Sequence, residues 1–443
     1  MTCRKISLAL ALGILLLSPL VVFASVKAKL LGASPELLAE PSLACPVRLA
    51  VPAGEEVEVL SLAQGWCLVQ LGTNTGYAPE ASLAFPATSL ALSSAYKLPP
   101  ESWKGQLTEP PVFSPRGDYA WFVGLKVEKE PAPSLYSLLY GFDLASGQVE
   151  ELTTFALTQA QITAAAKISK EALPSLMVQR LALSPEGLQL AVERYRDLPK
   201  ASTSSVLVLS QSGLELESLE LPGLTAPVFL MEELVACLER NAEGPDALRL
   251  HWVARAADDT VYPLEDAATR RYLALAPSPE GRRLALLRSP LTGSQPKLEL
   301  ALLTFAEGKP DFKALAILPG MKAPYSLRWL DETHIGLTCI EAARSQAMAV
   351  VLDLEDPDNP TSCWDLGDWA TWLPHGMGFL TLNKGDLYLR DLTSTDQTRL
   401  TTTGNVDDIK GSGPLVALSP TGRELLVSRE GRLWLLRLTP KLK

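Results

Sequence analysis

One short pattern, an apolar run followed by Ser-Pro-x-Gly and a second apolar run, occurs four times in this chain of 443 residues. The copies are VFSPRGDYA (112–120), ALSPEGLQL (182–190), APSPEGRRL (276–284) and ALSPTGREL (417–425). Ser and Pro suit the first two positions of a type I β-turn, and Gly at the fourth position accepts the positive φ with which the chain re-enters a strand. Each copy therefore predicts a β-hairpin whose first strand is buried.

Three further segments repeat the order apolar strand, polar turn, apolar strand: 224–240, 325–341 and 369–392. The seven units recur at intervals of roughly 45 residues, with a longer first interval of roughly 70. Each continues into a third apolar strand, such as SVLVLS (205–210), and often into a fourth. Four short antiparallel strands per period predict an all-β propeller, with seven blades expected and six or eight as the alternatives.

The last unit ends after its third strand, at Leu438, so one blade lacks a strand. Because an unpaired edge invites aggregation, we expect the missing strand to come from upstream of the first hairpin. This divides the second part of the chain into a linker and closing strand at 89–107 and a propeller at 108–443.

The long first interval contains LTQAQITAAAKISKEALP (157–174). A capping box at Thr158–Gln161 and a stop at Pro174 predict an amphipathic helix inserted at about 156–174. This helix either packs on the flank of the propeller or docks a partner.

The Ser-Pro-x-Gly hairpins, together with YGFDLASGQVEELT (140–153), resemble the TolB-type, WD40-like propeller repeat of exported bacterial proteins over about residues 105 to 440. The family usually has Asp in the turn, where this chain has Arg116, Glu186, Glu280 and Thr421. The resemblance implies a protein of the bacterial cell envelope that docks protein partners.

The first 24 residues have the organisation of a signal peptide. A basic start at Arg4 and Lys5 is followed by an apolar run and by Val22-Phe23-Ala24, which suits cleavage after Ala24. The alternative is an uncleaved anchor, which would be the chain's one attachment to a membrane. We therefore expect an exported protein of the periplasm or the extracellular space.

Residues 25–88 predict a small barrel of about five short strands. The segments VPAGEEVEVL (51–60), QGWCLVQL (64–71) and TGYAPEASL (75–83) resemble the bacterial SH3-like family. The resemblance makes Trp66 and Tyr77 candidate binding aromatics, with packing in the core or at the rim as the alternative. Cys45 and Cys67 fall on segments that neighbour each other in such barrels, so a disulfide between them is a candidate in an oxidising compartment.

Few residues suggest chemistry. The three histidines, His251, His334 and His375, show no metal-binding spacing, and the chain has no G-x-S-x-G motif and no glycine-rich phosphate loop. The formal net charge is −10, without a basic block, which argues against nucleic acid as a partner.

These features favour a non-catalytic binding or scaffolding protein, not an enzyme, with no cofactor or metal and a monomeric state. We expect it to hold an envelope protein or a peptidoglycan-type ligand through Trp66, Tyr77 and the turn residues Trp372 and His375. The alternative is a propeller enzyme, a hydrolase or lyase, with a composite active site in the central pocket. A pocket with buried carboxylates, or a His–carboxylate pair at one face, would indicate that alternative.

The signal-peptide interpretation makes a direct prediction. Protein purified from its native envelope should begin at Ser25, because signal peptidase removes segments of this type. Intact-mass measurement checks this start. A membrane fraction that retains residues 1–24 would support the anchor instead.

Overall fold

The computed structural model describes residues 25–30, 35–52, 54–98, 106–107, 110–128, 134–156, 178–195, 204–219, 223–240, 246–253, 255, 259–264, 266–293, 295–305, 310–363, 365–376, 378–392, 396–402, 404, 406–409 and 413–441. The predicted signal peptide and nearly all of the predicted inserted helix lie outside this set. The described part is all-β, as predicted; its helical pieces are the short 3-10 turns η1 (Glu80–Ser82), η2 (Ala87–Ser89) and η5 (Pro374–Gly376). The chain forms two compact units, residues 1–85 with 440–443, and residues 86–439.

The N-terminal unit is one seven-stranded antiparallel sheet in the order β3-β2-β6-β5-β4-β1-β7. Its strands are β1 (Val26–Leu30), β2 (Glu36–Leu38), β3 (Val47–Ala50), β4 (Glu56–Ala63), β5 (Trp66–Leu71), β6 (Asn74–Pro79) and β7 (Leu83–Ala84). Along β5 the burial alternates, with Cys67 and Val69 fully buried. This alternation is what a strand that is covered on one face requires.

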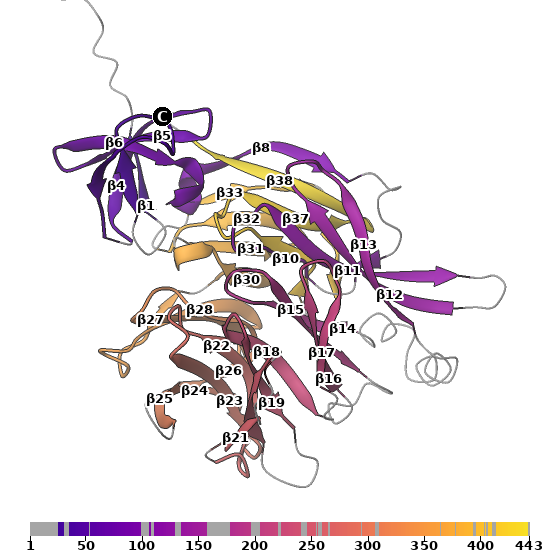
Figure 1. The fold of residues 1–443 in the computed structure, drawn as a ribbon. Coiled ribbons are helices and arrows are strands. Elements are labelled where there is room, and N and C mark those ends of the chain that lie inside the picture. Colours follow the sequence, from indigo (N-terminus) through magenta and orange to yellow (C-terminus); the bar gives the residue numbers. More distant parts are fainter. Residues whose placement is uncertain are drawn as a thin grey trace, which may run out of the picture. The chain divides into compact units, whose positions relative to one another are not determined.

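The second unit is a seven-bladed β-propeller, as predicted (Figure 1). Blade 1 is β10 (Val112–Phe113), β11 (Tyr119–Glu128), β12 (Ser134–Asp143) and β13 (Val149–Ala156), with β9 (Gln106–Leu107) also paired to β11. Blade 2 is β14 (Val178–Leu183), β15 (Gln189–Tyr195), β16 (Ser204–Ser210) and β17 (Glu215–Leu219). Blade 3 is β18 (Leu224–Met231), β19 (Leu234–Glu239), β20 (Ala247–Trp252) and β21 (Thr260–Pro263).

The remaining blades follow the same order. Blade 4 is β22 (Arg270–Pro277), β23 (Arg283–Pro290), β24 (Lys297–Thr304) and β25 (Asp311–Pro319). Blade 5 is β26 (Met321–Trp329), β27 (His334–Glu341), β28 (Gln346–Asp353) and β29 (Thr361–Cys363). Blade 6 is β30 (Trp369–Trp372), β31 (Phe379–Asn383), β32 (Asp386–Arg390) and β33 (Gln397–Arg399). A two-stranded hairpin, β34 (Asp408–Ile409) and β35 (Gly413–Pro414), precedes blade 7.

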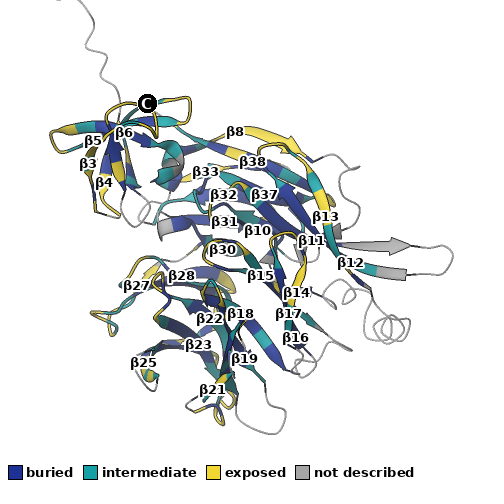
Figure 2. Ribbon diagram, in the orientation of Figure 1, coloured by how far each residue is buried: buried dark blue, intermediate teal, exposed yellow. Residues whose placement is uncertain are grey.

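Blade 7 takes its outer strand from an earlier part of the chain. It consists of β36 (Val416–Leu418), β37 (Glu424–Arg429), β38 (Arg432–Pro440) and, beside β38, β8 (Leu90–Lys97). The edge that the end of the chain leaves open on β38 is thereby paired, which removes a row of free backbone groups. Figure 2 shows β8 largely exposed on its outer side, as an outermost strand should be.

The hydrophobic core lies between consecutive blades. The middle strands, such as β16 and β24, are buried along most of their length, because each blade is covered by a neighbour on both faces (Figure 2). Blade 1 packs on blade 2 through a cluster that includes Trp121 and Val192. Another cluster, which includes Phe122 of blade 1 and Leu435 of blade 7, closes the ring.

The four Ser-Pro-x-Gly turns have one hydrogen-bond pattern. In each, the glycine N–H donates to the serine carbonyl at 2.8–2.9 Å, as in a β-turn (Gly117 to Ser114, Gly187 to Ser184, Gly281 to Ser278, Gly422 to Ser419). The serine hydroxyl is buried and accepts a second bond at 3.0–3.2 Å from the N–H five residues later (Tyr119, Gln189, Arg283, Glu424). The glycine φ angles lie between 69° and 77°, which confirms the predicted positive φ.

Each turn also touches the turn of the next blade. A Cβ on Gly187 would lie 2.6 Å from Pro115 Cδ, and one on Gly117 would lie 3.6 Å from Ser419 Cβ. Ser184 donates to Glu232 Oε1 at 2.5 Å, and Arg283 donates to the Glu332 carbonyl at 2.8 Å. The turns therefore form a continuous series of contacts on one face of the propeller, called the turn face below.

Replacing a glycine in these turns has two costs: strain of the left-handed backbone, and overlap of the new Cβ with the neighbouring blade. Gly281 and Gly147 have nearly the same φ, 69° and 71°, but a Cβ on Gly281 would lie 2.1 Å from Leu230 O, whereas nothing lies within 4 Å of one on Gly147. Gly147→Ala should cost about 1–2 kcal/mol for the left-handed backbone alone. Gly281→Ala should cost about 1–3 kcal/mol more, because the overlap adds to the strain. Urea unfolding measures both, and equal losses would show that the inter-blade contact at Gly281 contributes nothing.

Candidate functional site

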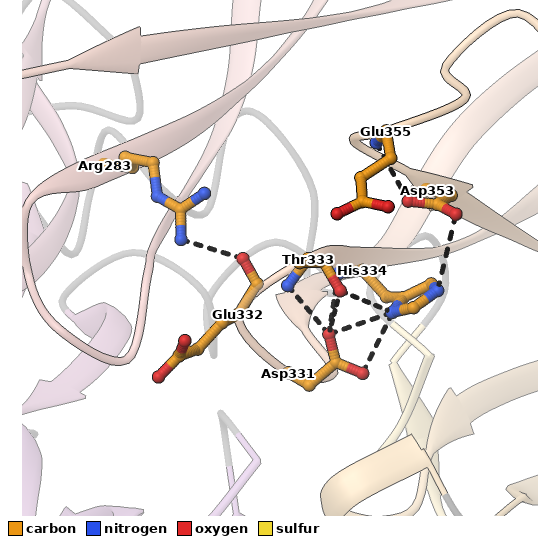
Figure 3. Close-up of polar contacts among 7 residues, drawn as sticks. All are labelled: Arg283, Asp331, Glu332, Thr333, His334, Asp353 and Glu355. Carbon is orange, nitrogen blue, oxygen red and sulfur yellow. Dashed lines mark hydrogen bonds and ion pairs between the residues drawn. The ribbon is translucent and has the colours of Figure 1, made fainter.

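The clearest polar constellation on the turn face lies in the turn of blade 5, Leu330–His334 (Figure 3). Asp331 Oδ1 accepts hydrogen bonds from the backbone N–H groups of Thr333 and His334, each at 2.8 Å. An Asp two residues before a Thr favours this local loop, because its carboxylate bonds to its own turn. The turn thereby fixes Asp331 beside the first residue of β27.

The His334 ring lies between two carboxylates, as Figure 3 shows. Its Nδ1 is 2.9 Å and 3.0 Å from the two carboxylate oxygens of Asp331, and its Nε2 is 4.0 Å from Asp353 Oδ2. The His334 side chain is 38% exposed, so a substrate can reach it. Partial burial acts to raise the pKa of Asp331, but hydrogen bonds from Thr333 and His334 outweigh it and hold that pKa below its usual value. Asp331 is therefore an anion at neutral pH.

A second group of contacts supports this turn. Arg283 donates to the Glu332 carbonyl, and its guanidinium lies 4.6 Å from the centre of the Trp329 ring. Asp353 accepts the Glu355 N–H at 2.9 Å, which fixes the second carboxylate. The contacts come from blade 4 and from the end of β28, so two blades hold the constellation. A histidine oriented by a carboxylate is a general acid–base group.

A cavity of about 450 Å³ lies among the innermost strands of the propeller. Its walls come from β10, β26, β30 and β36, with Leu183 from the end of β14. We call it the central channel. Most of its lining residues are apolar or aromatic, but polar atoms contribute as much of its surface as apolar atoms do, and hydroxyl groups come from Tyr325, Ser326 and Thr371.

Arg328 is the one charged side chain among the described residues that line the central channel. Its Nη1 lies 3.4 Å from the Trp372 carbonyl, and no described carboxylate forms an ion pair with it. Burial lowers the pKa of Arg328, because desolvation disfavours the charged form. The channel therefore presents a cation for which the described residues supply no counter-ion.

A different arrangement surrounds His251, which is buried. Its Nδ1 is 2.6 Å from Asp259 Oδ1 and its Nε2 is 3.0 Å from Glu217 Oε2. Arg249 also pairs with Asp259, at 2.6 Å. The His251 side chain is 9% exposed, and carboxylates from blades 2 and 3 lie within 3.0 Å of both ring nitrogens, so neither nitrogen is open to a substrate and this network is structural.

The structure corrects one of the predicted binding residues. Trp372 is 1% exposed, so it is not a contact on the turn face. Its ring packs on Phe379 with the ring centroids 4.4 Å apart, and it fills the space left by Gly336, where a Cβ would lie 2.7 Å from the indole. His375 lies in η5, and its side chain is outside the described set.

Trp66 and Tyr77 lie on the same side of neighbouring strands. Trp66 pairs with Pro79 and Tyr77 pairs with Leu68, so the two aromatics are diagonal neighbours, both half-buried. Their role as binding residues stays a prediction.

The predicted disulfide is absent, because Cys45 has a free thiol. Cys45 precedes β3, whereas Cys67 lies on β5, and two strands, β2 and β6, separate β3 from β5 in the sheet. The assumption that the two segments are neighbours was therefore wrong.

Sequence reasoning did not select Arg328 or the pair of His334 and Asp331. The local Asp-x-Thr-His order was a usable signal for the pair, since Asp in such a position bonds to the turn that follows. Within the described part of the chain, no cluster of three or more His, Cys, Asp or Glu side chains could hold a metal ion. No helix in the same part is long and apolar enough to cross a membrane.

Comparison with known proteins yields relatives in structure and not in sequence. No family model matches the chain, and no curated protein matches it. Hydrazine synthase from Kuenenia stuttgartiensis has a chain that matches with a TM-score of 0.50 and 13% identity, covering 77% of this chain and 98% of that one. The propeller domain of the Trilobed protease from Pyrococcus furiosus matches with a TM-score of 0.46 and 10% identity, covering 79% and 96%. Prolyl oligopeptidase B from Galerina marginata matches with a TM-score of 0.46 and 14% identity, covering 79% and 47%.

These neighbours correct the interpretation of the chain as a non-catalytic binding or scaffolding protein and not an enzyme. The solved structures that share its fold include chains of proteins named as enzymes, hydrazine synthase and a prolyl oligopeptidase. At these identities the likeness establishes the propeller fold alone. The case for catalysis therefore depends on the side chains of this chain.

The environments of half-buried Arg328 and buried Arg288 predict opposite effects on stability. Arg328→Met should raise the free energy of unfolding by about 1 kcal/mol, because it removes a partly desolvated charge that no described carboxylate pairs with. Arg288→Met should lower it by about 1–3 kcal/mol, because Arg288 Nε lies 3.2 Å from the buried carboxylate of Glu299. Urea unfolding of both variants measures the contrast. If Arg328→Met lowered the free energy of unfolding as much as Arg288→Met does, the interpretation that Arg328 has no ion-pair partner would be contradicted.

Proposed function

We propose that this chain is a propeller enzyme, a hydrolase or lyase, whose general acid–base group is His334 on the turn face. The proposal rests on one observation: the Asp331 carboxylate is held by its own turn and lies 2.9 Å from Nδ1 of a partly exposed histidine. A His–carboxylate pair at one face is the feature that distinguishes the enzyme from a binding propeller. The His251 network does not offer this chemistry, because the ring is buried and its Nε2 is occupied by Glu217 at 3.0 Å, whereas the nearest described carboxylate to Nε2 of the more exposed His334 is 4.0 Å away.

The roles follow from the geometry. With the Nδ1 proton donated to Asp331, Nε2 carries the lone pair and acts as the base. In a hydrolase, Nε2 takes a proton from the attacking water; in a lyase, it takes the proton that leaves the substrate carbon. Both carboxylates stabilise the imidazolium that forms, Asp331 at Nδ1 and Asp353 from 4.0 Å at Nε2. The protonated ring then returns the proton to the leaving group.

The finer assignments from the sequence form part of the proposal. The repeat pattern supports a TolB-type propeller, the N-terminal segments support an SH3-like barrel, and the first 24 residues support export. An exported enzyme would meet substrates of the periplasm or the extracellular space.

The proposal predicts which variants lose turnover. The protein is assayed with aryl esters, peptide anilides, aryl glycosides and a uronate polysaccharide, which report hydrolysis or elimination by absorbance. His334→Gln should reduce kcat/KM for the substrate class that is turned over by about 100-fold or more, because general base catalysis is lost. Asp331→Asn should reduce kcat/KM by less, because Nε2 remains but its orientation is weaker.

Asp356→Asn is the matched control, since Asp356 is an exposed carboxylate on the neighbouring loop that hydrogen-bonds to Asn359. It should leave turnover unchanged. Unaltered turnover in His334→Gln, with the fold intact by circular dichroism, would remove His334 from the mechanism. If no substrate class is turned over, the proposal that the protein is a hydrolase or lyase would be contradicted.

A further inference from the structure

The described lining of the central channel combines one cation with apolar side chains and polar groups. Trp369 and the edge of Phe113 supply aromatic surface, Val112, Val416 and Leu418 supply aliphatic surface, and Trp372 borders the channel but is almost wholly buried. The described lining residues include no Asp, Glu or His. The cavity of about 450 Å³ lies within the range of small-ligand sites.

Arg328 has more hydrogen-bonding capacity than the protein uses. A guanidinium carries five N–H donors, and one long contact, to the Trp372 carbonyl at 3.4 Å, is the one that Arg328 makes among the described residues. A partly desolvated charge without a partner is costly, and proteins usually pair or hydrogen-bond such groups. In contrast, Arg288 and Arg270 share the Glu299 carboxylate, at 3.2 Å and 2.7 Å. An anion from solution would supply what Arg328 lacks.

The wall chemistry selects the kind of anion. A planar fork matches the two oxygens of a carboxylate, and one cation balances one negative charge. A phosphate dianion would bring a second charge that no other cation among the described lining residues balances. The aromatic rings and aliphatic side chains favour a ligand with an apolar body, because removing that body from water adds to its affinity.

We propose that the central channel binds the carboxylate of a small apolar organic acid, with the carboxylate paired to Arg328 and the apolar body against Trp369 and Phe113. Ser326 and Thr371 provide hydroxyl groups beside the pair. The site is independent of the acid–base chemistry proposed for His334, which is not among the lining residues. Measurements of ligand binding therefore test this site, and measurements of turnover do not.

The test is calorimetric titration of the full chain with benzoate, and with benzamide as the neutral analogue. Benzoate should bind and benzamide should bind at least tenfold more weakly, because the charge pairs with Arg328. Arg328→Gln should weaken benzoate binding at least tenfold, and Arg328→Lys should weaken it less, since the charge remains but the fork is lost. Arg344→Gln, which removes an exposed arginine with a 61% accessible side chain, is the matched control and should bind like wild type.

Acetate and inorganic phosphate separate the ligand classes. Acetate should bind more weakly than benzoate, because it lacks the apolar body. Equal binding of benzoate and benzamide, equal binding of benzoate to wild type and Arg328→Gln, or tighter binding of phosphate than of benzoate would each overturn the proposal. Thermal unfolding of each variant confirms its fold, and if Arg328→Gln fails to fold, the comparison of wild type with Arg328→Lys decides.

Discussion

The buried serine hydroxyl of the Ser-Pro-x-Gly turn is the interaction on which the propeller most depends. It accepts the N–H of the residue that starts the second strand, and the turn glycine donates back to the serine carbonyl. The first two strands of a blade are thereby joined at a fixed register. Because successive turns also touch, as between Gly187 and Pro115, the same device sets the spacing of neighbouring blades. The pairing of β8 with β38 then removes the last open edge.

The candidate sites depend on that rigid scaffold. Asp331 and His334 belong to a turn of the same series, and Arg283 joins it to the turn of blade 4. The central channel exists because the innermost strands of several blades face one another, which places Arg328 opposite apolar side chains from blades 1 and 7. A site assembled in this way keeps its geometry without a ligand, since loops on a rigid scaffold lose little entropy when they bind.

The sequence was informative where the determinants are local. The turn serines and glycines sit within four residues of one another, so their hydrogen bonds and positive φ angles could be predicted. Trp372 was misjudged because its position two residues before the turn at Pro374 suggested exposure, whereas the alternation along β30 buries Ala370 and Trp372. The Cys45–Cys67 bridge failed because sheet order, not sequence, decides which segments are neighbours. Asp353 and His334 come from neighbouring strands, β28 and β27, and the residues around Arg328 come from four other blades. The sequence of one segment therefore could not predict either arrangement.

Native-state hydrogen exchange tests most directly whether the turns act as one ring. The backbone N–H of each turn serine, Ser114, Ser184, Ser278 and Ser419, donates to a carbonyl across its hairpin at 2.7–3.0 Å. If the ring holds the propeller together, all four amides should exchange with the same opening free energy, equal to that of global unfolding, although they belong to four different blades. Four distinct opening free energies, or fast exchange at one turn while the others stay protected, would show that the blades open independently and would contradict the account.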